Sequence, residues 1–368
     1  MTLAGHQPAD VFFANRERTI TGSGAQRAWT TGSPDVLADD AAKALAEAGP
    51  ALAVGAFPFD TGDSAALTIP HTVRTGPRTG PDGVLDAGEV IRFSALPEPA
   101  RHLAAVAELT GRIRAGVLNK AVLARVLDLE CRRPVDVAAV LANLVGGNPA
   151  AYAFAIPLPH GAVLTGASPE LLVSKTGDEV RSHPLAGSAR RSADPVRDRE
   201  NAVALAASAK NRAEHALVVE AVADALRPFC RDLVVPAEPE LVATPTMWHL
   251  GTPVRGILRD RATSSLRLAA ALHPTPAVCG TPRAAARAAI SDLEAFDRGF
   301  YAGLAGWVDA SGDGEWAVAI RCAEIAGTAM RLYAGGGIVA GSDPDAELDE
   351  TDAKFQTLLR AMGVEIAG

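Results

Sequence analysis

The alternation of hydrophobic and polar positions predicts helices and strands in mixed order along the chain. Apolar residues recur at helical spacing over 97–115, and this pattern changes over 120–130 (KAVLARVLDLE) to one typical of a strand. Helical spacing then returns in four further segments, 135–145, 196–226, 264–272 and 282–293. Long helices and strands are therefore both expected from about residue 97 onward.

The two ends of the chain have patterns typical of β-structure. Between 304 and 339, three strand-like runs are separated by the turn sequences ASGDG and AGT, which predicts an antiparallel meander. Residues 1–99 are rich in Gly, Pro, Thr and Asp, with short apolar islands, and are predicted to form strands and loops. Strands and long helices that do not alternate regularly favour an α+β fold over a doubly wound sheet.

Composition limits the classes of function. The chain has 368 residues, a net charge of -8 and a hydrophobic content of 48%, which is ordinary for an enzyme able to bury a large core. The acidic balance argues against nucleic acid or an acidic membrane as partner, because both require a basic face. No apolar run approaches the roughly 18 residues of a membrane span, and the N-terminus lacks the pattern of a signal peptide. We therefore expect a cytoplasmic protein.

Cysteine usage agrees with that expectation. The four cysteines are widely scattered, with no CxxC motif and no histidine at metal-ligand spacing. We expect them to be reduced and buried.

Several charged and glycine residues near the C-terminus point to a small anionic ligand. Glu347 and Glu350 are three residues apart at the start of a predicted helix, so one face would present two carboxylates to a divalent cation. The glycines at 335–337 let the backbone approach a ligand closely. Arg321 can hold a carboxylate through two parallel hydrogen bonds. The expected ligand is a small acid with several charges.

The local pattern also allows ordinary structural roles for these residues and for three further charged residues, Lys120, Glu170 and Glu214. Acids in the first turn of a helix are favoured by the helix dipole without any metal. Lys120 could pack its stem on the sheet and extend its ammonium group into water. Glu170 could be a turn residue, Arg321 a partner in a core ion pair, and Glu214 a solvated acid paired with Lys210 one helical turn away.

A series of motifs gives the chain a resemblance to a known family. From about residue 100 to the C-terminus the sequence resembles the chorismate-binding enzymes, and within them most closely isochorismate synthase, which moves a hydroxyl group around the chorismate ring. The motifs are LNKAVLAR (118–125), SPELL (168–172), HPLAGSARR (183–191), KNRAEH (210–215), HLGTPVRG (249–256), HPTPAVCG (273–280), GEWAVAIRCA (314–323), YAGGGIV (333–339) and ELDET (347–351). The resemblance implies an α+β fold with large antiparallel sheets packed together and helices on the outside. It also implies that 100–368 is the chorismate-binding catalytic core and that 1–99 is a strand-rich and loop-rich part of the same fold.

The resemblance assigns the reacting groups. It implies that Lys120 activates a water molecule as general base and that Glu170, as general acid, protonates the departing C4 hydroxyl. Glu214, Glu347 and Glu350 are implied as ligands of Mg²⁺, the hard cation that carboxylate oxygens prefer. The aminating relatives do not use a lysine base at this place.

The resemblance also implies a substrate pocket, although the chain departs from the family at some positions. The implied substrate-binding residues are Gly187, Ser188, His249, Ala277, Val278, Tyr301, Arg321, Gly335, Gly337 and Lys354. Asn211 stands where several relatives carry an acid, and Gly336 where alanine is usual. Ala186 replaces the lysine of relatives that form a covalent adduct. Salicylate synthases tend to have threonine at the position of Ala277, so the alanine favours isochorismate synthase.

We therefore expect a monomeric, Mg²⁺-dependent isochorismate synthase whose partner is the small molecule chorismate. Its product would feed siderophore, menaquinone or other secondary metabolism. The alternatives are a salicylate synthase, which also releases pyruvate, and an aminating synthase with an amidotransferase partner. A chorismate-binding subunit without catalysis is an alternative from a different class.

Overall fold

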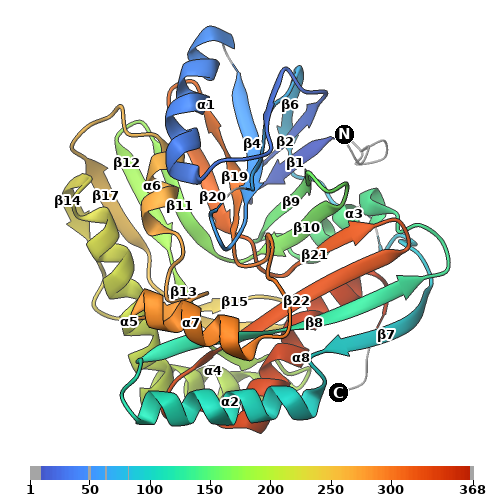
Figure 1. Ribbon diagram of the computed structural model, residues 1–368, viewed down its shortest axis with the longest axis vertical. Helices are drawn as coiled ribbons and strands as arrows, with labels where there is room; N and C mark the ends of the chain where they lie inside the picture. The colour runs from blue at the N-terminus through green and yellow to red at the C-terminus, as the bar shows by residue number, and fades with distance from the viewer. Residues whose placement is uncertain (1–9, 49–50, 63, 82, 365–368) are drawn as a thin grey trace.

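Two large antiparallel β-sheets face each other across the core, and helices cover their outer sides (Figure 1). The structure is a computed structural model, and it describes residues 10–48, 51–62, 64–81 and 83–364. Every strand pairing found in these residues is antiparallel.

The first sheet is ten-stranded within the described residues, in the order β18-β8-β22-β21-β10-β9-β1-β2-β6, with β7 also paired to β8. In chain order its strands are β1 (Val11–Ala14), β2 (Arg18–Ser23), β6 (Thr72–Pro77), β7 (Val90–Leu96), β8 (Lys120–Cys131), β9 (Tyr152–Pro157), β10 (Val163–Ser168), β18 (Gly280–Thr281), β21 (Cys322–Ala326) and β22 (Ala329–Ile338). The long strands β8 and β22 lie side by side, and their register pairs Val122 with Gly337 and Ala124 with Gly335. This pair carries much of the site described below.

The second sheet is nine-stranded over the same part of the chain, in the order β14-β17-β12-β11-β20-β19-β4-β5-β3. Its strands are β3 (Arg27–Trp29), β4 (Leu52–Phe57), β5 (Ala66–Ile69), β11 (Leu171–Thr176), β12 (Glu179–His183), β14 (Cys230–Val234), β17 (Val254–Leu258), β19 (Leu304–Asp309) and β20 (Gly314–Val318). A small sheet, β13-β16-β15, is formed by β13 (Leu185–Arg190), β15 (Glu240–Ala243) and β16 (Met247–Gly251). The strands of residues 10–96 belong to both large sheets, while the division at residue 99 stays a prediction.

The helices occupy the outside of the sheets (Figure 1). They are α1 (Pro34–Ala48), α2 (Pro99–Arg114), α3 (Val137–Gly147), α4 (Pro195–Ala207), α5 (Ala209–Leu226), α6 (Ser265–Leu272), α7 (Arg283–Leu293) and α8 (Pro344–Ala361). Several begin at a side-chain cap: Asp136 accepts a hydrogen bond from the Ala139 amide, and Asp343 from the Ala346 amide. Helices α2 and α8 pack together beneath β8 and β22.

The main hydrophobic core fills the space between the two large sheets. Phe13 and Ile20 of the first sheet and Val54, Phe57 and Trp316 of the second belong to one buried cluster. The rings of Phe57 and Trp316 have centroids 5.7 Å apart, and the indole N–H of Trp316 donates to Ser265 Oγ at 3.3 Å. Buried tryptophan is stable there because its one polar atom has a partner.

The α+β class is confirmed, and three local predictions were wrong. Residues 34–48 form helix α1 rather than strands or loops; its apolar side chains at Leu37, Ala41, Ala44 and Leu45 are buried at helical spacing. The helix predicted over 196–226 is interrupted at Ser208, which ends α4 and begins α5. The predicted meander consists instead of two hairpins, β19–β20 in one large sheet and β21–β22 in the other.

None of the helices in the described residues is long and apolar enough to cross a membrane.

The break at Ser208 yields a first prediction. The Ser208 hydroxyl accepts from the Asn211 amide at 3.3 Å and so caps the helix that carries Glu214. We expect Ser208→Ala to lower the free energy of unfolding by about 1 kcal/mol, the usual cost of a lost N-cap. Urea denaturation measures the change, and Ser208→Asp, which keeps an acceptor, is the control. Equal stability of the alanine variant and the wild type would contradict the assignment of the cap.

Candidate active site

The predicted site residues come together in one pocket between the large sheets and the small sheet. It is lined by all of them except Lys120 and Glu347, namely by Glu170, Gly187, Ser188, Glu214, His249, Ala277, Val278, Tyr301, Arg321, Gly335, Gly337, Glu350 and Lys354. The pocket is narrow, with a volume of about 60 Å³. Lys120 and Glu347 are outside this lining; Lys120 contacts the lining residue Glu214, and Glu347 contacts Lys210.

Lys120, the first residue of β8, is fully buried and faces the carboxylate of Glu214 on α5. Its Nζ lies 2.9 Å from Glu214 Oε1, and both side chains are almost inaccessible to water. The contact has the distance of an ion pair but not the angle of a hydrogen bond, so Lys120 Nζ has no hydrogen-bond partner among the described residues. The alternative in which this lysine reaches water is therefore wrong, as is the proposed pairing of Glu214 with Lys210.

Glu170 lies in the short connection between β10 and β11, where a strand of one large sheet leads into a strand of the other. Only 3% of the residue is exposed, and its Oε1 accepts a long hydrogen bond of 3.4 Å from the Leu185 amide. Burial raises the pKa of Glu170 to about 7, although this amide and the charges of Lys120, Arg321 and Lys354 oppose the rise. The carboxyl group can therefore carry a proton at neutral pH and give it to a neighbour.

Arg321 and His249 form the opposite wall of the pocket. Arg321 stands between β20 and β21 with φ of 51°, and its Nη2 lies 3.4 Å from His249 Nε2. Burial, reinforced by Arg321 and Lys354, holds the pKa of His249 well below its usual value, so the ring is neutral and can accept from the guanidinium. Among the described residues no carboxylate lies within ion-pair distance of Arg321. Its guanidinium is thus free to bind an incoming acid.

Glu347 and Glu350 lie on the first turns of α8, and each contacts a lysine. Glu347 Oε1 accepts from Lys210 Nζ at 2.9 Å and from Ser342 Oγ at 2.7 Å. Burial and the neighbouring Glu350 raise the pKa of Glu347. Although burial opposes it, the ammonium of Lys354, 2.5 Å away, lowers the pKa of Glu350.

The glycine run in β22 allows these acids to approach the sheet. A Cβ at Gly337 would lie 2.2 Å from Glu214 Oε1 and 2.9 Å from Lys120 Cε, and one at Gly336 would lie 2.9 Å from Glu347 Oε2. Lys354 Nζ donates to the Gly335 carbonyl at 2.7 Å. The three carboxylates therefore converge on consecutive glycines of one strand.

The remaining predicted residues complete the walls. The Tyr301 ring stacks on Tyr333 at 5.1 Å, and its hydroxyl lies 2.7 Å from where a Cβ on Gly335 would be. Gly187 has φ of 77° and packs against Asn211, so the departure at Asn211 lies beside the pocket rather than in its lining. A hydrogen bond from Ser188 also lowers the pKa of Glu350.

These carboxylates offer oxygen ligands, although they do not form a finished metal site. Among the described residues no three His, Cys, Asp or Glu side chains converge as they would around a bound ion. Glu214, Glu347 and Glu350 nevertheless border Gly336 and Gly337, and each is neutralised by a lysine. Carboxylate oxygens are the type of ligand that a hard divalent cation prefers.

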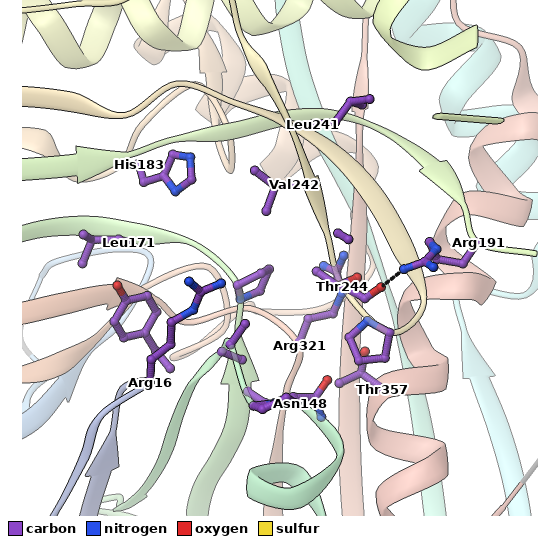
Figure 2. Close-up of a pocket in the computed structure, with 18 of the residues that line it drawn as sticks. Arg16, Asn148, Leu171, His183, Arg191, Leu241, Val242, Thr244, Arg321 and Thr357 are labelled. Atoms are coloured by element: carbon purple, nitrogen blue, oxygen red, sulfur yellow. Dashed lines mark hydrogen bonds between the residues drawn. The ribbon is translucent and has the colours of Figure 1, made fainter. Parts of the chain in front are cut away.

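A much larger cavity, about 680 Å³, lies beside this pocket and shares Pro169 and Arg321 with it (Figure 2). Arg16, His183 and Arg191 bring positive or titratable groups to its walls. Arg191 is already paired with Asp198 and donates to the Thr244 carbonyl, as Figure 2 shows for the second contact. Glu170, Glu214, Glu350 and Lys354 line the narrow pocket and not the larger cavity, so the narrow pocket is the candidate site for the chemistry.

The sequence pattern did not identify every residue of the site. Val122, Leu185, Ala186 and Ile320 also line the pocket, and the Leu185 amide contacts Glu170. Every residue except proline has a backbone amide, so the residue type does not indicate a contact of this kind. Ser342 could have been found, because it lies two residues before the first turn of the helix that carries Glu347.

Comparison with known proteins identifies the family. The sequence pattern described as "Chorismate binding enzyme" matches residues 85–363. The chain is 46% identical to the isochorismate synthase DhbC of Bacillus subtilis (strain 168), covering 99% of this chain and 96% of the relative. It is 39% identical to the isochorismate synthase EntC of Escherichia coli (strain K12), covering 99% of this chain and 97% of the relative.

A solved structure agrees with these relatives over the whole chain. The crystal structure of a putative 2,3-dihydroxybenzoate-specific isochorismate synthase, DhbC, from Bacillus anthracis superposes with a TM-score of 0.94 at 43% identity, covering 99% of both chains. The chain belongs to the chorismate-binding enzyme family. Within that family, these relatives are isochorismate synthases by name.

The glycine run yields a second prediction. At Gly337 a methyl group would displace the buried Glu214 carboxylate and Lys120 together. We expect Gly337→Ala to lower the free energy of unfolding by about 1–3 kcal/mol, as overpacking commonly does. The matched control is Gly336→Ala, whose methyl group would meet only the ends of two carboxylate side chains, Glu347 Oε2 at 2.9 Å and Glu350 Oε1 at 3.8 Å. Denaturation of both variants measures the difference, and equal stabilities would contradict the close approach at Gly337.

Proposed function

We propose that the protein is an isochorismate synthase, which adds water at C2 of chorismate and removes the C4 hydroxyl. The observation that carries the proposal is the combination of a carboxyl group with a pKa of about 7, which lines the pocket, and the fully buried Lys120 outside that lining, whose Nζ has no hydrogen-bond partner among the described residues. The first suits a general acid near neutral pH, and the second can serve as a base. The family and the names of the relatives support the same choice.

The proposed reaction needs one proton removed and one supplied. Lys120, as the free amine, takes a proton from water while the water oxygen bonds to C2. The ring double bonds shift, the C4–O bond breaks, and Glu170 donates its proton to the departing hydroxyl, which leaves as water. Product and substrate are isomers, and solvent restores the protonation of Lys120 and Glu170.

The charged walls would bind and orient the substrate. Arg321 offers an unpaired guanidinium to a substrate carboxylate, and neutral His249 keeps it in place. Because the pocket is narrow, an entering dicarboxylate would have to replace some of the lysine–glutamate contacts.

We further propose that Glu214, Glu347 and Glu350 hold Mg²⁺. A bound divalent ion would supply positive charge for the ring carboxylate. Glu214 also contacts Lys120 Nζ at 2.9 Å, so the cation and the lysine would compete for the same carboxylate.

Incubation of the purified protein with chorismate and Mg²⁺, followed by chromatography of the products, tests the proposal. Isochorismate should appear and should disappear when the ion is chelated. Pyruvate and salicylate as main products would identify a salicylate synthase instead, and a requirement for ammonia an aminating enzyme. Binding of chorismate without any product would overturn the catalytic proposal.

The role of Lys120 yields a third prediction. Lys120→Ala should reduce kcat by at least about 100-fold, within the usual contribution of a general base, while chorismate binding measured by calorimetry should change little. Lys175→Ala is the matched control, because Lys175 is another buried lysine paired with an acid, Asp313, outside this pocket. A Lys120→Ala enzyme that kept most of its turnover would rule out this base.

The raised pKa of Glu170 yields a fourth prediction. Its carboxyl group is protonated below about pH 7 and loses the proton as the pH rises through that value. The rate should therefore fall about tenfold per pH unit above the folded pKa, as for a general acid. A profile of kcat against pH measures this fall. Glu170→Gln should lose most of the activity, and the activity that remains should lack the alkaline limb. A rate that stayed constant up to about pH 9 would exclude Glu170 as the acid.

A further inference from the structure

We infer that Arg298 and Glu294 are positioning residues, which hold the strand of Lys120 and the Val278 loop at a fixed separation. Both side chains are buried, with only 3% of each exposed, and neither lines the pocket. The inference rests on the proposed function, because it concerns the placement of the proposed base. Strand β8 has a gap in the hydrogen bonding along one edge, and these two side chains lie there.

One edge of β8 lacks a continuous partner strand. The short strand β18 pairs with Lys120 and Ala121, and β7 pairs with β8 only from Val126 onward. In between, the Val122 amide donates to the Cys279 carbonyl at 2.8 Å. The Val122 carbonyl and the Ala124 amide, which point to the same edge, have no strand opposite them.

The two side chains fill this gap. Glu294 Oε1 accepts from the Ala124 amide at 2.8 Å, and Arg298 Nη2 donates to the Val122 carbonyl at 2.8 Å. Buried backbone groups require such partners. Glu294 and Arg298 thus replace the missing part of a neighbouring strand.

Arg298 also fixes the loop that faces Val122 across the pocket wall. Its Nη1 donates to the Val278 carbonyl at 2.7 Å, while Nε and Nη2 donate to Glu294 at 2.9 and 2.6 Å. Val122 and Val278 both line the pocket. One planar guanidinium therefore sets the distance between two lining segments, which a flexible lysine could not do at both carbonyls.

The contacts of Arg298 and Glu294 with β8 lie on the side of the pocket that carries Lys120, and the Arg298 guanidinium also lies 5.9 Å from the centroid of the Tyr301 ring. Lys120 is two residues before Val122 on the same strand, whereas Arg321 lies in the connection between β20 and β21 and Lys354 lies on α8. Loosening the edge of β8 should therefore misplace the proposed base while leaving the residues that hold the substrate carboxylates in place. The effect should fall on kcat rather than on KM.

The test is Arg298→Lys. This variant keeps a positive charge beside Glu294 but loses the planar guanidinium, whose N–H groups donate to both carbonyls. We expect kcat to fall by about 10-fold to 100-fold, as small misplacements of catalytic groups do, with KM changed less than about twofold. Hydrogen exchange should become faster in a peptide covering 118–126. Glu294→Gln, which retains an acceptor for the Ala124 amide, should show the same changes more weakly and serves if the first variant does not fold.

The matched control is Arg78→Lys. Arg78 likewise donates to backbone carbonyls, those of Asn15, Val145, Asn148 and Ala151, and lies outside the pocket. It should lose stability without loss of kcat and without faster exchange in 118–126. If Arg78→Lys lost as much kcat as Arg298→Lys at an equal fall in Tm, or if Arg298→Lys kept its kcat, the positioning role would be overturned.

The two proposals can fail separately. If the wild type does not convert chorismate, the proposed function fails, and the exchange measurement still decides on the edge of β8. Faster exchange in 118–126 for Arg298→Lys and not for Arg78→Lys would then support the positioning role, and equal exchange would overturn it.

Discussion

The pocket depends on the cost of removing charged side chains from water. A buried ion is tolerated only when another charge or several hydrogen bonds compensate for the lost hydration. Lys120 and Glu214, and Arg298 and Glu294, meet this requirement as contacting pairs. Among the described residues the Glu170 carboxyl group accepts one long hydrogen bond and forms no ion pair, and burial raises its pKa to about 7. The same constraint thus keeps some groups charged and lets one carry a proton.

The register of β8 and β22 determines where the charged side chains of the site can lie. Antiparallel pairing places the glycines of β22 directly opposite residues 122–124 of β8, and the absence of side chains there lets acids from α5 and α8 reach the sheet. The helices therefore contribute the carboxylates while the strands contribute a rigid floor. Since β8 begins with Lys120, the register that aligns the glycines also determines where the amine lies.

The sequence predicted most of this site because residue type and spacing carry the information. Glu347 and Glu350 share a helix face by spacing alone, and the motifs around Lys120 and Glu170 supplied the resemblance. Helix α1 was missed because the composition of its surroundings suggested loops, although Leu37, Ala41 and Leu45 recur at helical spacing. The meander was wrong for a different reason: local pattern does not reveal that β20 and β21 belong to different sheets.

The lysine contacts of the three acids could not be predicted from local pattern, and they change how the site is understood. With Lys120, Lys210 and Lys354 each beside a glutamate, these three pairs are nearly neutral before any ligand enters. A cation held by the proposed glutamate ligands would leave the ammonium group of Lys354 without its carboxylate partner at the pocket wall, where an anionic substrate can bind it. In a chain with a net charge of -8, this exchange would give the pocket a local attraction for an acid that the overall charge opposes.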